Sequence, residues 1–267
     1  MRRSRLVVLV SSFLLAVGAA LTGATAAQGA EAAATGYVAL GDSYSSGVGA
    51  GSYIGSSGDC KRSTKAYPSL WAAANSPSSF SFTACSGART DEVLASQLTP
   101  LGASTGLVTL SVGGNDAGFA DVMTTCVLQS DSACISRIDT ARAYVTSTLP
   151  GKLDTVYSTI RSKAPAAQVV VLGYPRFYLL GQSCLGLSET KRKAVNDASD
   201  LLNSTIAKRV ADHGFTWADV RTTFTGHEIC SGNSWLHSVN WLNVGESYHP
   251  TAAGQSGGYL PVLNSAT

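Results

Sequence analysis

The sequence has little charge, and the charge that it has is balanced. Only 13% of the 267 residues are Asp, Glu, Lys or Arg, about half of the roughly 25% that is usual in globular proteins. Three arginines and Glu31 lie in the first 34 residues, so residues 35–267 carry 16 basic and 16 acidic side chains. A chain without net charge offers no basic surface to nucleic acid or to an anionic membrane. We therefore expect no nucleic-acid partner.

The sequence also lacks an apolar run long enough to span a bilayer. The one candidate, from Leu6 to about Leu21, is broken by two serines and falls short of the roughly 20 residues that a spanning helix needs. Arginines precede this run, and small residues follow it through Ala34. A basic head, a short apolar body and a tail of small residues are typical of a secretory signal peptide. We expect residues 1–34 to be that peptide and the mature protein to be secreted, extracellular and without a transmembrane segment.

Metal-binding cysteine motifs are missing, although cysteine itself is not. The sequence has no Cys-x-x-Cys pair, and its histidines lack a recognised ligand spacing. An even number of cysteines behind a signal peptide predicts disulfides. Six cysteines allow 15 pairings, of which sequential pairing is the simplest. We expect no metal and no organic cofactor. The cysteines, all in the mature part, are Cys60, Cys85, Cys126, Cys134, Cys184 and Cys230.

Apolar runs of strand length alternate with helix-length stretches, and no repeat or long linker interrupts them. Continuous rather than alternating apolar runs are typical of buried parallel strands. A long helix is expected from about Ser188 to His213, ending at Gly214, and Thr90 is expected to cap another. This alternation predicts one doubly wound α/β domain over residues 35–267, with its ligand site at the carboxyl ends of the strands. The expected strands are residues 37–40, 80–83, 107–112, 169–172 and 215–218.

Polar, glycine-rich segments follow the first three of these strands. Gly41-Asp42-Ser43 comes directly after the first, Gly87 follows the second, and Gly113-Gly114-Asn115-Asp116 follows the third. A serine at a strand-to-helix turn can expose its hydroxyl as a nucleophile. Taken alone, the first segment is equally well explained as a helix cap. Gly87 taken alone is better explained as an ordinary turn glycine, and the third segment also fits a turn.

His249 is the histidine best placed to act as a base. It lies in Glu246-Ser247-Tyr248-His249-Pro250, before a short terminal helix that Pro250 can start. A rival serine motif, Gly254-Gln255-Ser256-Gly257-Gly258, formally matches the Gly-x-Ser-x-Gly elbow of α/β-hydrolases. No apolar strand precedes it and no histidine follows it, so we reject it.

Together these segments resemble the four ordered blocks of the SGNH, or GDSL, hydrolases. The whole mature chain is similar to the secreted lipases and phospholipases of actinobacteria, in particular at Gly41-Asp42-Ser43-Tyr44-Ser45-Ser46-Gly47 and at Gly113-Gly114-Asn115-Asp116-Ala117-Gly118-Phe119. The resemblance implies a flavodoxin-like fold, a three-layer α/β/α sandwich with a central, mainly parallel sheet. It also implies the disulfides Cys60–Cys85, Cys126–Cys134 and Cys184–Cys230.

The resemblance also implies the roles of individual residues. Ser43 would be the nucleophile and His249 its general base. The oxyanion would be bound by the backbone N–H groups of Ser43 and Gly87 and by the side-chain amide of Asn115. The family pattern has Asp three residues before the histidine, where this sequence has Glu246. Some relatives orient the histidine with a backbone carbonyl instead, here that of Ser247, and we favour this second arrangement.

The expected activity is hydrolysis of fatty-acyl esters by a monomeric lipase or phospholipase. Trp235, Leu236, Trp241 and Leu242 are candidates for an acyl-binding face, although packing in the core explains them equally well. Two alternatives remain: an acetyl or carbohydrate esterase on the same scaffold, and a secreted binding protein without catalysis.

Overall fold

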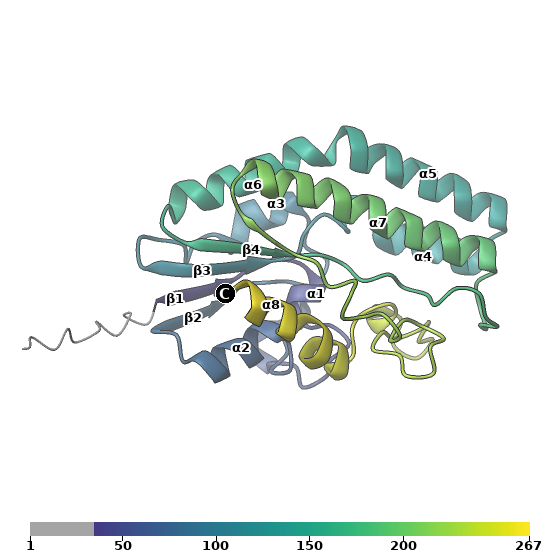
Figure 1. Cartoon of the computed structure of the whole chain (residues 1–267), viewed down its shortest axis with the longest axis horizontal. Helices are drawn as coiled ribbons and strands as arrows, with labels where there is room; N and C mark the ends of the chain where they lie inside the picture. Colours follow the sequence, from purple (N-terminus) through teal and green to yellow (C-terminus); the bar gives the residue numbers. More distant parts are fainter. Residues whose placement is uncertain (1–34) are drawn as a thin grey trace, which may run out of the picture. The chain divides into compact units, whose positions relative to one another are not determined.

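The computed structural model describes residues 35–267; the predicted signal peptide lies outside the described residues. Its centre is a five-stranded parallel sheet of strand order β2-β1-β3-β4-β5 (Figure 1). The strands are β1 (Gly36–Ala39), β2 (Ser79–Phe82), β3 (Thr105–Leu110), β4 (Gln168–Leu172) and β5 (Thr216–Ala218). Every predicted strand is present within two residues of its expected bounds.

The central strands are continuous apolar runs because their side chains are buried on both faces of the sheet. Val38 of β1 pairs with Val108 of β3, which pairs with Val169 of β4, and all three side chains are buried. The edge strand β2 is less buried: Ser79 and Phe80 are exposed, and Ser81 and Phe82 are half-buried. Helices must therefore cover both faces of the sheet.

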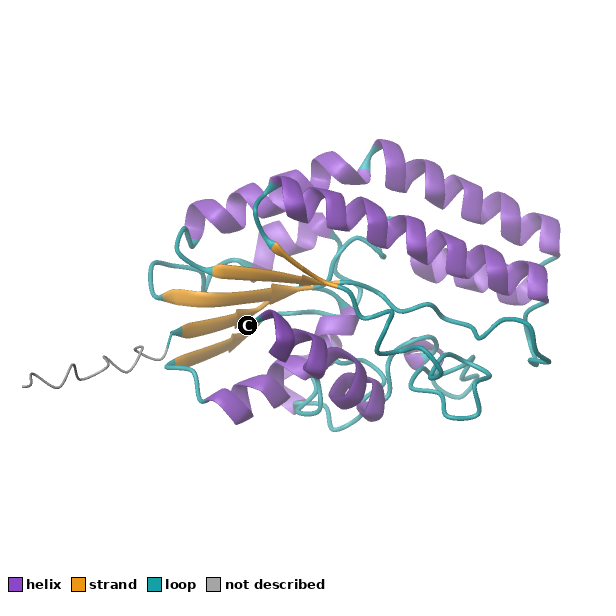
Figure 2. Cartoon of the chain, in the orientation of Figure 1, coloured by secondary structure: helices purple, strands orange, loops and turns teal. Residues whose placement is uncertain are grey.

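Helices lie on the two faces of the sheet, which makes the predicted three-layer α/β/α sandwich (Figure 2). One face carries α3 (Thr90–Glu92), α5 (Asp131–Ser147), α6 (Leu149–Lys163) and α7 (Glu189–Asp212). The other carries α2 (Tyr67–Asn75) and α8 (Leu260–Ala266). The remaining elements are α1 (Ser43–Ser46), η1 (Gly55–Cys60), η2 (Val93–Gln97), α4 (Phe119–Leu128), η3 (Val244–Glu246) and η4 (Gly254–Tyr259).

Helix α7 has the bounds that its capping residues predict. The Ser188 hydroxyl accepts the backbone N–H of Lys191 at the start, and Gly214 adopts a left-handed backbone, φ +64°, just past the end. The predicted cap at Thr90 is wrong. Thr90 is the first residue of α3, and Arg89 occupies the cap position. The Thr90 hydroxyl donates to the Asp116 carboxylate at 2.6 Å.

Three disulfides join Cys60 to Cys85, Cys126 to Cys134, and Cys184 to Cys230. These are the sequential pairs implied by the resemblance. The first connects η1 to the segment that carries Gly87, and the second connects α4 to α5. Both bonds therefore brace elements close to the segments singled out in the sequence.

Candidate active site

Ser43 is the first residue of α1 and lies at the carboxyl end of β1. Asp42 caps the helix by accepting the backbone N–H of Tyr44 at 3.0 Å. The turn requires glycine at position 41, because its φ is +120° and an added Cβ would lie 2.5 Å from the Ser111 carbonyl oxygen. The Gln97 amide clamps the same turn, accepting the Gly41 N–H and donating to the Gly41 carbonyl. The serine is thus held on a fixed turn at the carboxyl ends of the strands.

His249 meets Ser43 from the other end of the chain. Its Nε2 lies 2.7 Å from the Ser43 Oγ, although the two residues are 206 positions apart. The backbone around His249 is paired with the segment at His237: the His237 N–H donates to the His249 carbonyl, and the Tyr248 N–H donates to the His237 carbonyl. This short ladder fixes the position from which the imidazole reaches the serine.

The second ring nitrogen of His249 lies 3.0 Å from the Ser247 carbonyl oxygen. The Glu246 carboxylate is bound elsewhere, since its Oε1 accepts the Tyr53 hydroxyl at 2.7 Å. A carbonyl only accepts, so Nδ1 must carry the hydrogen, which leaves the Nε2 lone pair facing the Ser43 hydroxyl. This is the tautomer that a general base needs.

The electrostatic environment keeps His249 neutral. Desolvation by the surrounding protein lowers the pKa of the His249 imidazole to about 4, and the Ser247 carbonyl opposes this shift only in part. The ring is therefore uncharged and ready to accept a proton throughout the neutral range.

Gly87 and Asn115 line the same pocket as Ser43 and His249. The Asn115 Nδ2 donates to the Ala88 carbonyl at 3.0 Å. A primary amide has two N–H groups, so this bond orients the side chain and leaves the second N–H for a ligand. Asp116 adds a further tie between the two segments, because it accepts both the backbone N–H and the hydroxyl of Thr90.

Beneath the serine lies a buried network that the sequence analysis missed. Asp42 accepts hydrogen bonds from the Ser111 hydroxyl and the Tyr174 hydroxyl, each at 2.6 Å. Burial raises the pKa of the Asp42 carboxyl to about 6, although these donors pull it downwards. The Tyr174 hydroxyl also lies 3.3 Å from the Gly114 N–H, so it links the serine turn to the segment of Asn115. The available signal was position: Ser111 directly follows β3, and Tyr174 comes two residues after the end of β4.

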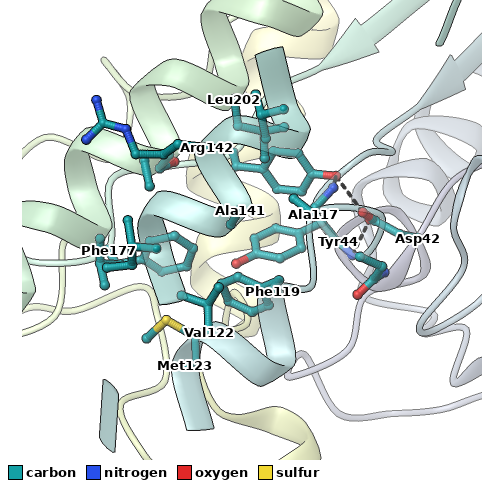
Figure 3. A pocket seen from close by; sticks show the side chains of 18 of the residues that line it. Asp42, Tyr44, Ala117, Phe119, Val122, Met123, Ala141, Arg142, Phe177 and Leu202 are labelled. Atoms are coloured by element: carbon teal, nitrogen blue, oxygen red, sulfur yellow. Dashed lines mark hydrogen bonds between the residues drawn. The ribbon is translucent and has the colours of Figure 1, made fainter. Parts of the chain in front are cut away.

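A largely apolar pocket opens at Ser43 and extends between α4, α5 and α7 (Figure 3). Asp42 lies at one side of the view, and Phe177 and Arg142 lie at the other. The apolar wall residues that follow Phe119 in α4, and those of α5 and α7, were not singled out from the sequence, because their spacing also fits ordinary helix packing. The apolar walls include Val122, Met123, Ile138, Val145, Val195 and Leu202.

The tryptophan and leucine side chains proposed as an acyl-binding face do not form one. Leu236 is buried in the core, and Trp235 stacks on His227 with ring centroids 3.5 Å apart. Trp241 lines a second, wider pocket between α4 and residues 239–249, and Leu242 is fully exposed. The two pockets meet at Ser43, Asn115, Phe119 and Met123.

The rejected serine motif lies in a helix. Ser256 belongs to η4, and its hydroxyl donates to the Ala252 carbonyl one turn earlier at 3.0 Å. Among residues 35–267, no group of three or more His, Cys, Asp or Glu side chains is placed to hold a metal ion.

Comparison with known proteins assigns the chain to a family. The model of the GDSL-like Lipase/Acylhydrolase family matches residues 39–256. The chain is 76% identical to Lipase 1 of Streptomyces coelicolor over the full length of both. Among solved structures, it is similar to phospholipase A1 from Streptomyces albidoflavus NA297 (69% identity, TM-score 0.87) and to an extracellular lipase from Streptomyces rimosus (68%, 0.86), covering 88% of this chain and all of each structure. The chain belongs to the GDSL-like lipase/acylhydrolase family.

Proposed function

We propose that this carboxylic-ester hydrolase is a secreted lipase or phospholipase that cleaves fatty-acyl esters through an acyl-enzyme on Ser43. The observation that carries the proposal is the 2.7 Å approach of His249 Nε2 to Ser43 Oγ at the junction of two pockets. The relatives named lipase and phospholipase A1 support the same substrate class.

In the proposed mechanism, His249 removes the Ser43 proton as the oxygen attacks the ester carbonyl. The hydrogen bond from Nδ1 to the Ser247 carbonyl holds the ring in place while its charge develops. The new oxyanion accepts hydrogen bonds from the Ser43 and Gly87 N–H groups and from the free N–H of Asn115. His249 then protonates the leaving alcohol, and water repeats the cycle on the acyl-enzyme.

The pocket between α4, α5 and α7 suits the acyl chain. Its walls are buried apolar side chains such as Ile138 and Leu202, and an alkyl chain gains roughly 0.8 kcal/mol for each CH₂ that it buries. The wider pocket, which contains His249 and Gly87, is left for the leaving alcohol and its head group. His249 would then protonate the alcohol on the side from which it departs.

Two observations support export of the protein. Residues 1–34 have the pattern of a secretory signal peptide, and the three disulfides are of a kind that persists in oxidising compartments. Residues 35–267 would then be the mature protein, folded as one domain. No helix in this described part is long and apolar enough to cross a membrane. The monomeric state and the lack of a nucleic-acid partner stay predictions.

The test is release of the carboxylic acid from tributyrin, a long-chain triacylglycerol, phosphatidylcholine and an acetylated sugar, with Ser43→Ala as the blank. We expect the native chain to hydrolyse the acyl lipids and Ser43→Ala to hydrolyse none. Release from the acetylated sugar alone would replace the lipase assignment with a carbohydrate esterase. A folded protein that released nothing and that a serine-directed phosphonate did not label would be a binding protein.

A further inference from the structure

Three large exposed apolar side chains line the wider pocket, and a fourth follows one of them in the chain. Leu242 is 100% exposed, Trp241 68%, Leu128 65% and Val244 64%. Single exposed apolar residues are normal, but a contiguous group marks a binding surface. We call these four residues the apolar rim.

The rim is continuous with the candidate active site. Leu128, Trp241 and Val244 line the same pocket as Ser43 and His249, and Leu242 is next in the chain to Trp241. Leu128 is the last residue of α4, whereas the other three belong to the loop before His249. Two separate segments thus present apolar side chains at one opening.

The loop is held in the shape that exposes these side chains. The Asn240 side-chain oxygen accepts the backbone N–H groups of Leu242 and Asn243, both at 3.1 Å. The Asn240 N–H donates in turn to the Ser247 hydroxyl at 2.8 Å. A braced loop loses little conformational freedom when a partner covers it, which favours binding.

The four rim residues carry no charge, and the charged groups beside their segments have both signs: Asp121, Asp131 and Glu246 flank the segments in the chain, and the Lys61 Nζ lies next to Gly245. Residues 122–130 and 239–245 contain no Asp, Glu, Lys or Arg, and the mature chain as a whole has none in excess. Such a surface has no electrostatic preference for anionic lipid. A tryptophan beside aliphatic residues is instead suited to the boundary between lipid head groups and acyl chains.

We propose that the apolar rim docks on the surface of a zwitterionic phospholipid bilayer and places the mouth of the active-site pocket against the lipid. This inference rests on the proposed function, because it makes the bilayer the source of the acyl ester. Docking would let an acyl chain pass from the bilayer to Ser43 without crossing water.

The first experiment measures binding alone. The full chain with Ser43→Ala is mixed with phosphatidylcholine vesicles and its bound fraction is measured by sedimentation. Adding Leu242→Asp should weaken binding about tenfold, the loss expected from removing one buried leucine. Adding Leu185→Asp, at a leucine that is 95% exposed but belongs to neither rim segment, should leave binding unchanged. Raising NaCl from about 0.1 to about 1 M should not release the parent protein, since salt screens only charges.

The second experiment measures hydrolysis with Ser43 present. Leu242→Asp should release fatty acid from vesicles about tenfold more slowly and hydrolyse monomeric p-nitrophenyl butyrate at the native rate, because Leu242 lines neither pocket. Equal vesicle binding by Leu242→Asp and its parent, an equal loss with Leu185→Asp, or binding to anionic vesicles alone would overturn the docking surface. A failure of the proposed function is distinguishable, because native protein would then release no fatty acid from any lipid while the binding assay remained readable.

Discussion

The Tyr53 hydroxyl donates to Glu246 Oε1 at 2.7 Å and accepts the Gly49 N–H at 2.9 Å. The carboxylate that stands three residues before His249 is thereby bound to the loop after α1, and the imidazole is left with the Ser247 carbonyl as its partner. This pairing decides which residue we expect to orient the base.

Glu246→Gln should keep kcat within about threefold of the native value, whereas neutralising the acid of a working triad costs about 10⁴-fold. The reason is that the Ser247 carbonyl, a backbone group, is untouched by the substitution. Steady-state hydrolysis of a soluble ester checks this, with Tyr53→Phe as the matched variant that leaves the carboxylate in place. A loss near 10⁴-fold in Glu246→Gln alone would make Glu246 the third member of a triad.

Asn115→Ala should lower kcat by about 10²–10³ with KM little changed, because the lost N–H is needed mainly when charge develops on the oxygen. Kinetics with a soluble ester separate the two constants. Thermal unfolding serves as the control, since the bond from Asn115 to the Ala88 carbonyl is also lost. A drop of less than about tenfold would remove Asn115 from the oxyanion hole.

The acid limb of kcat/KM should contain a step near pH 4, where His249 gains its proton, rather than near the ordinary histidine value of about 6.5. Below this pH the base is blocked, so activity falls as pH falls. Because Asp42 titrates near pH 6, NMR of the His249 ring is needed to assign the step. A ring that titrated near 6.5 would contradict the prediction.

The pH dependence of the unfolding free energy is less useful than NMR for assigning the pKa values of His249 and Asp42. The lowered pKa of His249 makes the folded state lose stability as pH falls from about 6.5 towards 4. The raised pKa of Asp42 acts in the opposite direction, since its stabilising effect is lost as pH rises from about 4 through 6. The two contributions therefore have opposite signs over the same pH window.

Tyr174→Phe should destabilise the fold by about 1–3 kcal/mol, because one buried Asp42 oxygen loses its donor. The loss should be greater at pH 8, where Asp42 is ionised, than at pH 4, where it is protonated. Urea unfolding at both values measures this. Tyr259→Phe is the matched control: its hydroxyl donates to the neutral Gly173 carbonyl, so its cost should not depend on pH. A pH-independent loss in Tyr174→Phe would show that Asp42 does not rely on this bond.

Local signals in the sequence predicted the sheet and the long helix well. Buried parallel strands need continuous apolar runs, and Ser188 and Gly214 mark the two ends of α7. The placement of Ser43, Gly87 and Asn115 after successive strands followed from the same reasoning, because parallel strands end at one edge of the sheet. These features depend on neighbours in the chain, which a sequence displays directly.

The features that were missed depend on partners far away in the chain. Glu246 could be compared with the family pattern, but nothing near it indicated Tyr53, 193 positions earlier. The prediction that Thr90 caps a helix considered only its neighbours in the chain. Its hydroxyl instead donates to Asp116, which lies 26 residues later. The walls of the apolar pocket come from three helices whose inward faces looked like ordinary core.

The separation of Ser43 and His249 has a consequence for biosynthesis. The nucleophile is made early, whereas its base lies on the last loop before η4 and α8. A nascent chain in which His249 has not yet been synthesised has a serine without its base, and should therefore have no hydrolytic activity. Closing a contact across 206 residues also costs more chain entropy than closing a local one. Hydrolytic activity should thus appear only when the two ends of the domain have joined, which makes the enzyme's own turnover a reporter of completed folding.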